Sequence, residues 1–386
     1  MAEVNELPQR EKKIYERDSR ILHGAGPSNI HESVYRAMSS QPWDHLDPQF
    51  IEFMNGVQGK LVTMFRAERA AFTMPFTGTG TAGMGSLAAC LTDKTDRVLS
   101  VEMGHFGEVI TKTLRVHADT VDTLDVEWGK TLNPSQLEAK LRTNHYNAVW
   151  LVHGETSTGA QQPYMGDIGN IIHNHGALYV VDMVPTFGAA YVNMKGWGVD
   201  AAYAASQKGL GAPTGLAPIA LRERALQKML TLEGKRPWYF DISAIMKYWL
   251  KETTERTYHH TAPVIDLFGL DAAMDLVLDE GLKDSARRIS GETKKLRSGL
   301  EKLGFTQVVK EANQRMANLD AVYPPGDINE AILRADLSDD RYVISGGLGD
   351  FKGKVVRVGV MGEGAKGQRI DDLLVAIEDN MNKQRK

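Results

Sequence analysis

Two charged residues follow short apolar runs at positions where an α/β sheet would hold a ligand. Asp182 ends the run 177–182 (ALYVVD), and Lys208 lies in the segment 206–209 (SQKG) that follows the run 201–205 (AAYAA). If both runs are strands, the two side chains meet at the carboxyl edge of one sheet, where open α/β sheets bind ligands.

Lys208 and Asp182 are of the types that pyridoxal phosphate needs. Desolvation lowers the proton affinity of a lysine, and its free amine then forms a Schiff base with an aldehyde. An aspartate at the end of an apolar strand can balance a protonated pyridine nitrogen, which is the second requirement of this cofactor. Taken alone, a lysine before a glycine turn is more often an ordinary surface lysine. Other segments of the chain are therefore needed to choose between the two interpretations of Lys208.

A loop rich in glycine and threonine, 77–85 (TGTGTAGMG), separates the apolar run 70–76 from a helix expected over 82–91. Glycines allow close backbone approach, threonines add hydroxyl donors, and the start of a helix presents free N–H groups to an anion. The segment therefore predicts a phosphate cradle.

The same loop also satisfies G-x-G-x-x-G at Gly78, Gly80 and Gly83, and Glu102 follows Gly83 after 19 residues. A dinucleotide site, and with it an NAD-dependent dehydrogenase, is thus an alternative. Pro75 argues against it because proline interrupts the preceding strand. A plain glycine turn is the third interpretation.

Two further loops should lie at this edge of the sheet. Phe106 lies in 103–107 (MGHFG), where its ring either stacks on a flat cofactor or simply packs. The strand expected over 148–152 leads into the polar loop 153–159 (HGETSTG). The alternation of strands, polar loops and helices predicts an α/β fold with a mainly parallel sheet.

Arg357 interrupts the apolar strand expected over 355–360. A guanidinium in such a strand has to be paired because it does not lose its proton. Its partner is either a structural Asp or Glu or the carboxylate of a substrate.

Composition limits the function classes. The 386 residues suggest two domains, and a net charge of −4 gives no reason to expect nucleic acid or an anionic membrane as partner. The single cysteine, Cys90, excludes a disulfide within the chain and favours a reducing compartment. We find neither a long apolar stretch nor a signal peptide, so we expect a cytoplasmic protein. We expect no metal site either, because no carboxylate or cysteine stands at ligand spacing around the histidines.

We divide the chain into an exposed N-terminal arm (1–22), a large domain (23–270) and a small C-terminal domain (271–386). Apolar spacing predicts helices over 47–65 and 264–278.

Taken together, the motifs resemble the class V, fold type I aminotransferases that use pyridoxal phosphate, and are most similar to the alanine–glyoxylate and serine–glyoxylate aminotransferases. The resemblance rests on eight segments in the family's order: GAGPSN (24–29), TGTGTAG (77–83), GHFG (104–107), HGETSTG (153–159), VVDMV (180–184), SQKGLGAPTG (206–215), YHHTAPV (258–264) and GGLG with KVVRVG (346–349 and 354–359).

The resemblance implies a mainly parallel seven-stranded sheet in the large domain and a smaller α+β C-terminal domain. It makes Lys208 the Schiff-base lysine, Asp182 the partner of the pyridine nitrogen and Phe106 the stacking aromatic, where the family usually has tryptophan or tyrosine.

The remaining cofactor contacts are also carried over from the resemblance. Thr79, Gly80 and Thr81 match the phosphate cup, with Gln207 beside it. Thr156 matches the hydroxyl near the phenolic oxygen of the ring, although its loop is one residue longer relative to Asp182 than the family spacing.

The resemblance further implies a homodimer with composite sites, in which Tyr258 and Thr261 reach the phosphate of the neighbouring subunit. Arg357 resembles the anchor for the substrate carboxylate, and Gly26, in the loop 23–29 bordering the site, is a second substrate candidate.

The implied activity is a ping-pong transfer of an amino group from alanine, serine or a similar small amino acid to a small 2-oxo acid such as glyoxylate or pyruvate, by way of pyridoxamine phosphate. An ureidoglycine–glyoxylate aminotransferase or another aminotransferase of the same fold is the nearest alternative. A cysteine desulfurase is disfavoured because Cys90 lies in an expected helix.

Overall fold

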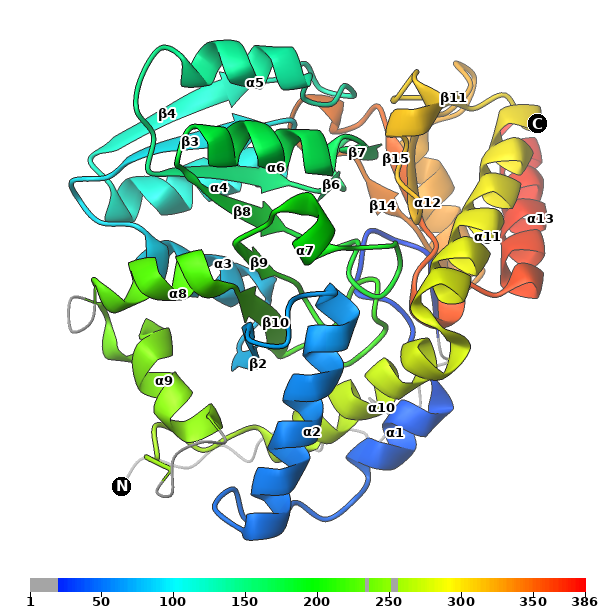
Figure 1. Ribbon diagram of the computed structural model, residues 1–386. Helices are drawn as coiled ribbons and strands as arrows, with labels where there is room; N and C mark the ends of the chain where they lie inside the picture. Colours follow the sequence, from blue (N-terminus) through cyan, green and yellow to red (C-terminus); the bar gives the residue numbers. More distant parts are fainter. Residues whose placement is uncertain (1–19, 233–235, 251–255) are drawn as a thin grey trace, which may run out of the picture.

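The computed structural model describes residues 20–232, 236–250 and 256–386, and its large domain is built on one seven-stranded sheet (Figure 1). In this sheet β10 runs antiparallel to both of its neighbours, and the other adjacent strands are parallel. The expected mainly parallel seven-stranded sheet is therefore confirmed. In spatial order the strands are β2 (Phe72–Thr77), β10 (Leu216–Leu221), β9 (Ala201–Tyr203), β8 (Leu178–Asp182), β5 (Ala148–Val152), β3 (Arg97–Glu102) and β4 (Thr120–Asp125).

Helices cover both faces of this sheet, which is why its central strands are apolar along their whole length. One layer contains α3 (Gly80–Leu91), α4 (His105–His117) and α8 (Glu223–Leu230), and the other contains α5 (Pro134–Leu141), α6 (Met165–Asn174) and α7 (Met194–Trp197). Helices α2 (Pro48–Phe65) and α10 (Val264–Glu280) pack against β2 and β10, α1 (Glu32–Met38) packs against α10, and α9 (Ile242–Trp249) lies beside α8 in Figure 1.

Local sequence signals explain where these elements begin. Helix α2 starts after Asp47, whose carboxylate accepts a hydrogen bond from the Gln49 amide, and Pro48 occupies the first helical position. Pro75 does lie within a strand, but β2 is at the edge of the sheet, where proline is tolerated. In the ladder Pro75 faces Pro218, so two residues without an amide hydrogen share one position.

The C-terminal part folds around a four-stranded antiparallel sheet with its own apolar core. The strands are β11 (Thr306–Gln307), β12 (Leu319–Tyr323), β15 (Val356–Gly359) and β14 (Ser345–Gly346), and the helices are α11 (Leu282–Lys302), α12 (Glu330–Asp339) and α13 (Gly367–Gln384). This is the expected smaller α+β unit.

Two short pairings complete the fold. The strand β1 (Ile21–Leu22) runs parallel to β13 (Tyr342–Val343), and β6 (Gly154–Glu155) pairs with β7 (Ala160–Gln161). Residues 1–19 of the predicted arm lie outside the described residues, whereas its last two residues are those of β1.

The division into domains stays a prediction. Helix α10 crosses the proposed boundary at residue 270, and its Leu267 and Val277 both belong to the large apolar core. The core of the C-terminal part contains Ala189 of the large domain, and its other members begin with Ile289 on α11. In the described part of the chain, no helix is both long and apolar enough to span a membrane.

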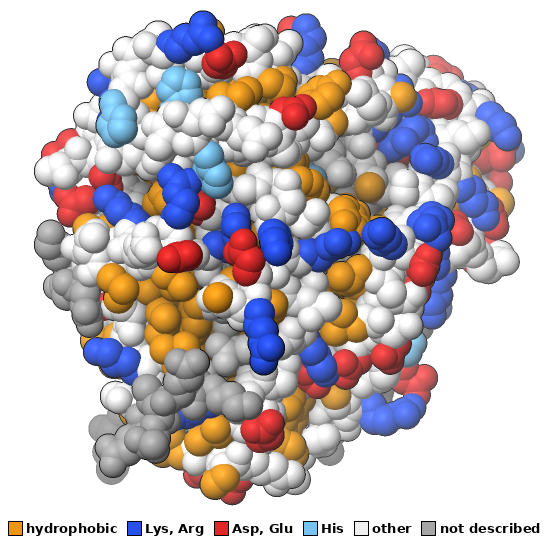
Figure 2. All heavy atoms as spheres, viewed as in Figure 1, with side chains coloured by type: hydrophobic (Ala, Val, Ile, Leu, Met, Phe, Trp, Pro, Cys, Tyr) orange, Lys and Arg blue, Asp and Glu red, His pale blue; other side chains and the backbone are white. Residues whose placement is uncertain are grey.

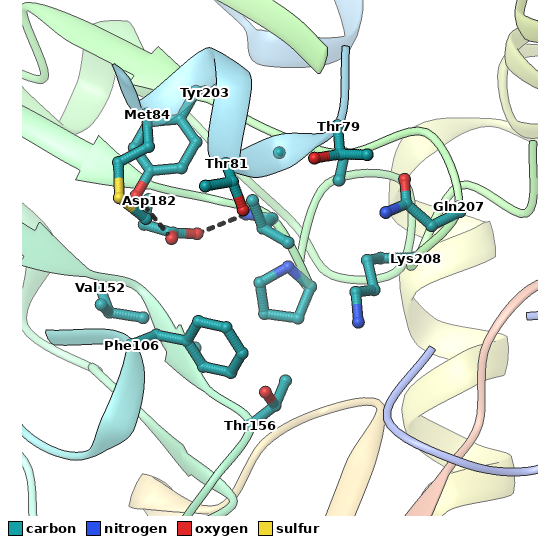
Figure 3. A pocket seen from close by; sticks show the side chains of 15 residues that line it. Thr79, Thr81, Met84, Phe106, Val152, Thr156, Asp182, Tyr203, Gln207 and Lys208 are labelled. Atoms are coloured by element: carbon teal, nitrogen blue, oxygen red, sulfur yellow. Dashed lines mark hydrogen bonds between the residues drawn. The ribbon is translucent and has the colours of Figure 1, made fainter. Parts of the chain in front are cut away.

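The topology decides where the chemistry-bearing residues meet. Strand β8 ends at Asp182, β9 ends at Tyr203, and these two residues are partners in the parallel register. The start of α3 and the segment that carries Lys208 lie at the same edge of the sheet (Figure 3).

Candidate active site

A cavity of about 200 Å³ opens at this edge of the sheet (Figure 3). It brings together eight of the residues singled out in the sequence, which come from segments up to 129 positions apart, from Thr79 to Lys208. The lining residues are Thr79, Gly80, Thr81, Met84, Phe106, Val152, Gly154, Thr156, Asp182, Val184, Pro185, Tyr203, Ala205, Gln207 and Lys208.

Asp182 is buried at the deep end of the cavity, and both of its oxygens have a donor. The Val184 amide donates to Oδ1 at 2.7 Å, and the Tyr203 hydroxyl donates to Oδ2 at 2.7 Å. Burial raises the pKa of Asp182 to about 7, and the nearby Glu155 adds to this, whereas the two donors and Lys208 oppose it. A positive charge placed in the cavity would therefore favour the ionised form of Asp182.

Lys208 projects into the cavity from the opposite side, as Figure 3 shows. Its ammonium nitrogen donates to the carbonyl oxygen of Ala25 at 2.6 Å, and the carbonyl oxygen of Gly26 lies at 3.5 Å. Burial, and secondly the charge of Arg357, lower the pKa of Lys208 to about 8. The amine is thus much easier to deprotonate than an exposed lysine.

Gly26 controls the space beside this lysine. A Cβ atom at this position would lie 2.3 Å from Cδ of Lys208, and the φ angle of +96° belongs to the region that favours glycine. Gly26 contacts Lys208 directly but is not one of the residues that line the cavity. Its substrate contact stays a prediction.

The third side of the cavity is the start of α3. Thr79 is the N-cap residue, and its side chain makes no capping hydrogen bond. Gly80 and Thr81 are the first two helical positions, whose amides have no acceptor within a helix, whereas the next amide, of Ala82, donates to the Thr79 carbonyl at 2.8 Å. Gln207 lies alongside, and its buried Oε1 has no hydrogen-bond partner among the described residues. The amides and hydroxyls at the start of α3, with the side-chain NH₂ of Gln207, are donors at one end of the cavity, as a phosphate cradle requires.

Phe106 and Thr156 form the wall opposite α3. Glu155, which the sequence analysis did not single out, holds this wall together: its carboxylate accepts hydrogen bonds from the Phe106 amide at 3.0 Å and the Gly107 amide at 3.3 Å. It also accepts from the amide and the hydroxyl of Ser157, at 3.0 and 2.6 Å. Burial raises the pKa of Glu155, and these four donors oppose that rise. The first turn of α4 and the Thr156 loop are thereby fixed to each other.

Arg357 is buried on β15 and has no carboxylate partner in the described part of the chain. Its Nε donates to the carbonyl oxygen of Gly346 at 2.7 Å, and Nη1 donates to that of Thr156 at 3.3 Å. Burial lowers the pKa of Arg357, while the charge of Glu155 has the opposite effect. Of the two partners considered from the sequence, the structural Asp or Glu is not found, and Arg357 keeps hydrogen-bonding capacity for a ligand.

Tyr258 and Thr261 do not line the cavity of their own chain. Tyr258 is 52% exposed, and its hydroxyl lies 3.2 Å from Oγ1 of Thr261. The pair is therefore free to contact another molecule, and its expected role in a neighbouring subunit stays a prediction.

Sequence reasoning missed Tyr203 and Glu155. Tyr203 was within the expected strand and would have been found by aligning the ends of the two strands, since the register places it beside Asp182. Glu155 lies in a motif that was noted, but no local signal indicates that its carboxylate caps a helix 49 residues away in the sequence.

The residues present fit pyridoxal phosphate. The cavity offers an amine of lowered pKa, a buried carboxylate, an aromatic ring in its wall and, at the start of α3, free donors that include the Thr79 hydroxyl, which makes no capping hydrogen bond. Among the described residues, no group of three or more His, Cys, Asp or Glu is arranged to hold a metal ion.

Comparison with known proteins defines the family. The model of the aminotransferase class-V family matches residues 23–324, so the chain belongs to this family. It is an aminotransferase of class V with the fold type I architecture. This family uses pyridoxal phosphate. Membership in it excludes the alternative of an NAD-dependent dehydrogenase. Glu102, the acid that such a dehydrogenase would use, accepts a hydrogen bond from the hydroxyl of Thr111 at 2.5 Å.

Three relatives show the range of this similarity. The crystal structure of an alanine–glyoxylate aminotransferase from Nostoc sp. has 36% sequence identity and a TM-score of 0.92, and the match covers 98% of this chain and 100% of that one. The (S)-ureidoglycine–glyoxylate transaminase of Bacillus subtilis is 30% identical over 379 residues, covering 93% of this chain and 90% of the relative. A pyridoxamine–pyruvate aminotransferase structure from Mesorhizobium loti has 25% identity, a TM-score of 0.90, and coverage of 96% and 94%.

Proposed function

We propose that this class V aminotransferase binds pyridoxal phosphate and moves an amino group from a small amino acid, such as alanine or serine, to a small 2-oxo acid, such as glyoxylate or pyruvate, by a ping-pong mechanism. The observation that carries the proposal is the cavity in which Lys208, Asp182 and Phe106 converge beside the start of α3, with a buried Arg357 that lacks a carboxylate partner among the described residues.

Each residue then has a defined task. When bound, the cofactor supplies an aldehyde that condenses with amines and a ring that accepts electrons from the substrate carbon. Lys208 would provide the amine that holds it and, once released, would move the proton from the substrate Cα to the cofactor carbon that carried the aldehyde, and in the opposite direction when the 2-oxo acid reacts. Asp182 would stabilise the proton on the ring nitrogen, and Phe106 would pack against the ring.

The two ends of the cofactor and the substrate are held by different donors. Thr79, Gly80, Thr81 and Gln207 bind the phosphate, since the start of α3 favours an anion. The hydroxyl of Thr156, which lines the cavity, would donate to the phenolic oxygen of the ring. Arg357 binds the carboxylate that amino acids and 2-oxo acids have in common, which lets one site accept both substrates of a ping-pong reaction.

A small substrate is favoured by the size of the cavity, about 200 Å³, which the substrate would share with the cofactor. The relatives whose names include glyoxylate or pyruvate support small 2-oxo acids as acceptors.

An (S)-ureidoglycine donor is the second candidate, and the similarity to the Bacillus subtilis transaminase favours it. A cysteine desulfurase is disfavoured on structural grounds. Cys90 is buried in α3, its thiol donates to the carbonyl oxygen of Phe240 at 3.1 Å, and burial raises its pKa to about 11. Such a thiol cannot serve as a mobile nucleophile.

We also propose that two copies of the chain form a homodimer with composite sites. Large apolar side chains are exposed close to the pair Tyr258 and Thr261: Trp238 is 61% exposed and its ring stacks on His259. Figure 2 shows apolar side chains gathered on the surface beside α8 and α9, a clustering typical of a subunit contact. Tyr258 and Thr261 would then complete the phosphate site of the partner.

The test is a substrate panel run on the purified protein. We expect bound pyridoxal phosphate to be visible by absorbance, and this absorbance to change when a small amino acid is added without a 2-oxo acid, as a ping-pong half-reaction requires. Steady-state rates for alanine, serine and (S)-ureidoglycine, each with glyoxylate and with pyruvate, then identify the donor and acceptor. A protein that binds no pyridoxal phosphate, or whose bound cofactor responds to none of these amines, contradicts the proposal.

A further inference from the structure

Tyr203 lines the cavity, but none of the roles proposed above involves it. It ends β9, its side chain is fully buried, and its hydroxyl donates to Oδ2 of Asp182 at 2.7 Å. A phenylalanine would fill the same apolar space without the cost of burying a hydroxyl. The hydroxyl therefore calls for an explanation beyond packing.

The geometry around Asp182 supplies one. Each carboxylate oxygen can accept two hydrogen bonds, and the Val184 amide and the Tyr203 hydroxyl each occupy one position on a different oxygen. The carboxylate is thus fixed from two sides and cannot rotate without losing both bonds. The accepting positions of Asp182 that are still free face the cavity (Figure 3).

Burial and a nearby negative charge destabilise the ionised form of Asp182. The residue is 2% exposed, and Glu155 on β6 adds a second negative charge nearby. Lys208, after β9, is the ionisable group whose positive charge favours the carboxylate, and Tyr203 and Val184 are its hydrogen-bond donors. If the Schiff base uses the amine of Lys208, the two donors become more important for keeping Asp182 charged.

We propose, on the basis of the proposed function, that Tyr203 is a positioning residue of the reaction: its hydroxyl keeps Asp182 ionised and turns the open side of the carboxylate toward the ring nitrogen of pyridoxal phosphate. A donor to the charged form of an acid stabilises that form. The hydroxyl acts through Asp182, and the parallel register, Asp182 opposite Tyr203, makes the arrangement a rigid part of the sheet.

The chain offers a matched control. Tyr179 lies on the adjacent strand β8 and is also fully buried, but its hydroxyl contacts Sδ of Met165 at 3.5 Å and not a charged group. Tyr203→Phe and Tyr179→Phe each remove one hydroxyl from the same core, and both keep the ring. Only the first variant removes a donor from Asp182.

Two measurements test the role without relying on turnover. The carboxyl band of Asp182 is identified in the infrared spectrum of the apoenzyme as the band that disappears in Asp182→Asn. Titration of this band should show that the apparent pKa of Asp182 is about one unit higher in Tyr203→Phe than in the unmodified protein. The dissociation constant for pyridoxal phosphate should rise about tenfold in Tyr203→Phe. Tyr179→Phe should change neither quantity.

A double variant tests whether the Tyr203 hydroxyl acts through Asp182 or independently of it. In the Asp182→Asn background, adding Tyr203→Phe should cause no further loss of cofactor affinity, because the hydroxyl acts through the carboxylate. Additive losses, or a Tyr203→Phe apoenzyme in which Asp182 titrates as in the unmodified protein, would overturn the proposal. The infrared titration needs no cofactor, so failure of the proposed function, seen as an unmodified protein that binds no pyridoxal phosphate, is a separate result.

Discussion

The two ends of the active-site cavity are built in different ways. At the deep end, Asp182 and Tyr203 lie on neighbouring strands and are fixed by backbone register. Beside the outer end, Arg357 on β15 of the C-terminal sheet donates to the carbonyl oxygen of Gly346 on the neighbouring strand β14 and to that of Thr156, which follows β6. The deep end is therefore fixed within one sheet, whereas the contacts of Arg357 join the C-terminal sheet to a loop of the large domain.

The two ends of the cavity also differ in the charged side chains that lie near them. Asp182 lies at the deep end, and Glu155 lies behind the wall that carries Phe106 and Thr156; burial raises both of their pKa values. Lys208 projects into the cavity from the side opposite Asp182, Arg357 lies outside the lining, and burial lowers the pKa of both. Under the proposed function, Asp182 would face a pyridinium and Arg357 a substrate carboxylate.

Removing Lys208 should have the largest effect, because both ends depend on it. We expect Lys208→Ala to lower the transamination rate by about a thousandfold or more, since the proton transfer and the covalent link are both lost. Lys195→Ala, at an exposed position, is the control and should retain full activity.

Mixing subunits extends this test to the proposed dimer. Hybrids of Lys208→Ala subunits with subunits carrying Tyr258→Ala and Thr261→Ala contain one site with both contributions intact. Activity at low cofactor concentration should reappear on mixing, and its absence in confirmed hybrids would contradict composite sites.

Arg357→Lys should separate the outer end from the deep end. A lysine keeps the charge but not the planar fork, so we expect KM for amino acid and 2-oxo acid to rise about 10- to 100-fold. The dissociation constant for pyridoxal phosphate should stay unchanged, opposite to the expectation for Tyr203→Phe. Arg334→Lys is the matched control, because Arg334 also lies near Gly346 but its guanidinium pairs with Glu330 on its own helix, whereas that of Arg357 reaches the Thr156 loop. Neither arginine is among the residues that line the cavity. A loss of cofactor affinity in Arg357→Lys would show that the two ends are not independent.

The smallest effect concerns pH. Because burial and Arg357 lower the pKa of Lys208 to about 8, its amine becomes free above that pH and not only above 10.5. We expect the rate at which the apoenzyme takes up pyridoxal phosphate to rise with pH through about 8. Arg357→Ala removes a positive charge, so the pKa of Lys208 should rise and the profile should move to higher pH. A profile unaffected by this substitution would rule out electrostatic coupling between the two ends.

Much of the deep end could be predicted from the sequence. Apolar runs that end in a polar residue identified Asp182 and the segment of Lys208, and the run of glycines and threonines identified the start of α3, because these signals are local. The membership of the chain in its family confirms the fold and the class of enzyme that these motifs indicated.

The outer end and the supporting contacts depended on tertiary structure. The sequence left open whether Arg357 faces a structural carboxylate or a ligand, and only packing brings it to the carbonyl groups of residues 156 and 346. Likewise, the capping of α4 by Glu155 and the bond from Tyr203 to Asp182 join separate segments. Periodicity and turn chemistry act over a few neighbouring residues, whereas the partner of a buried charge is decided by whichever distant segments the fold packs against it.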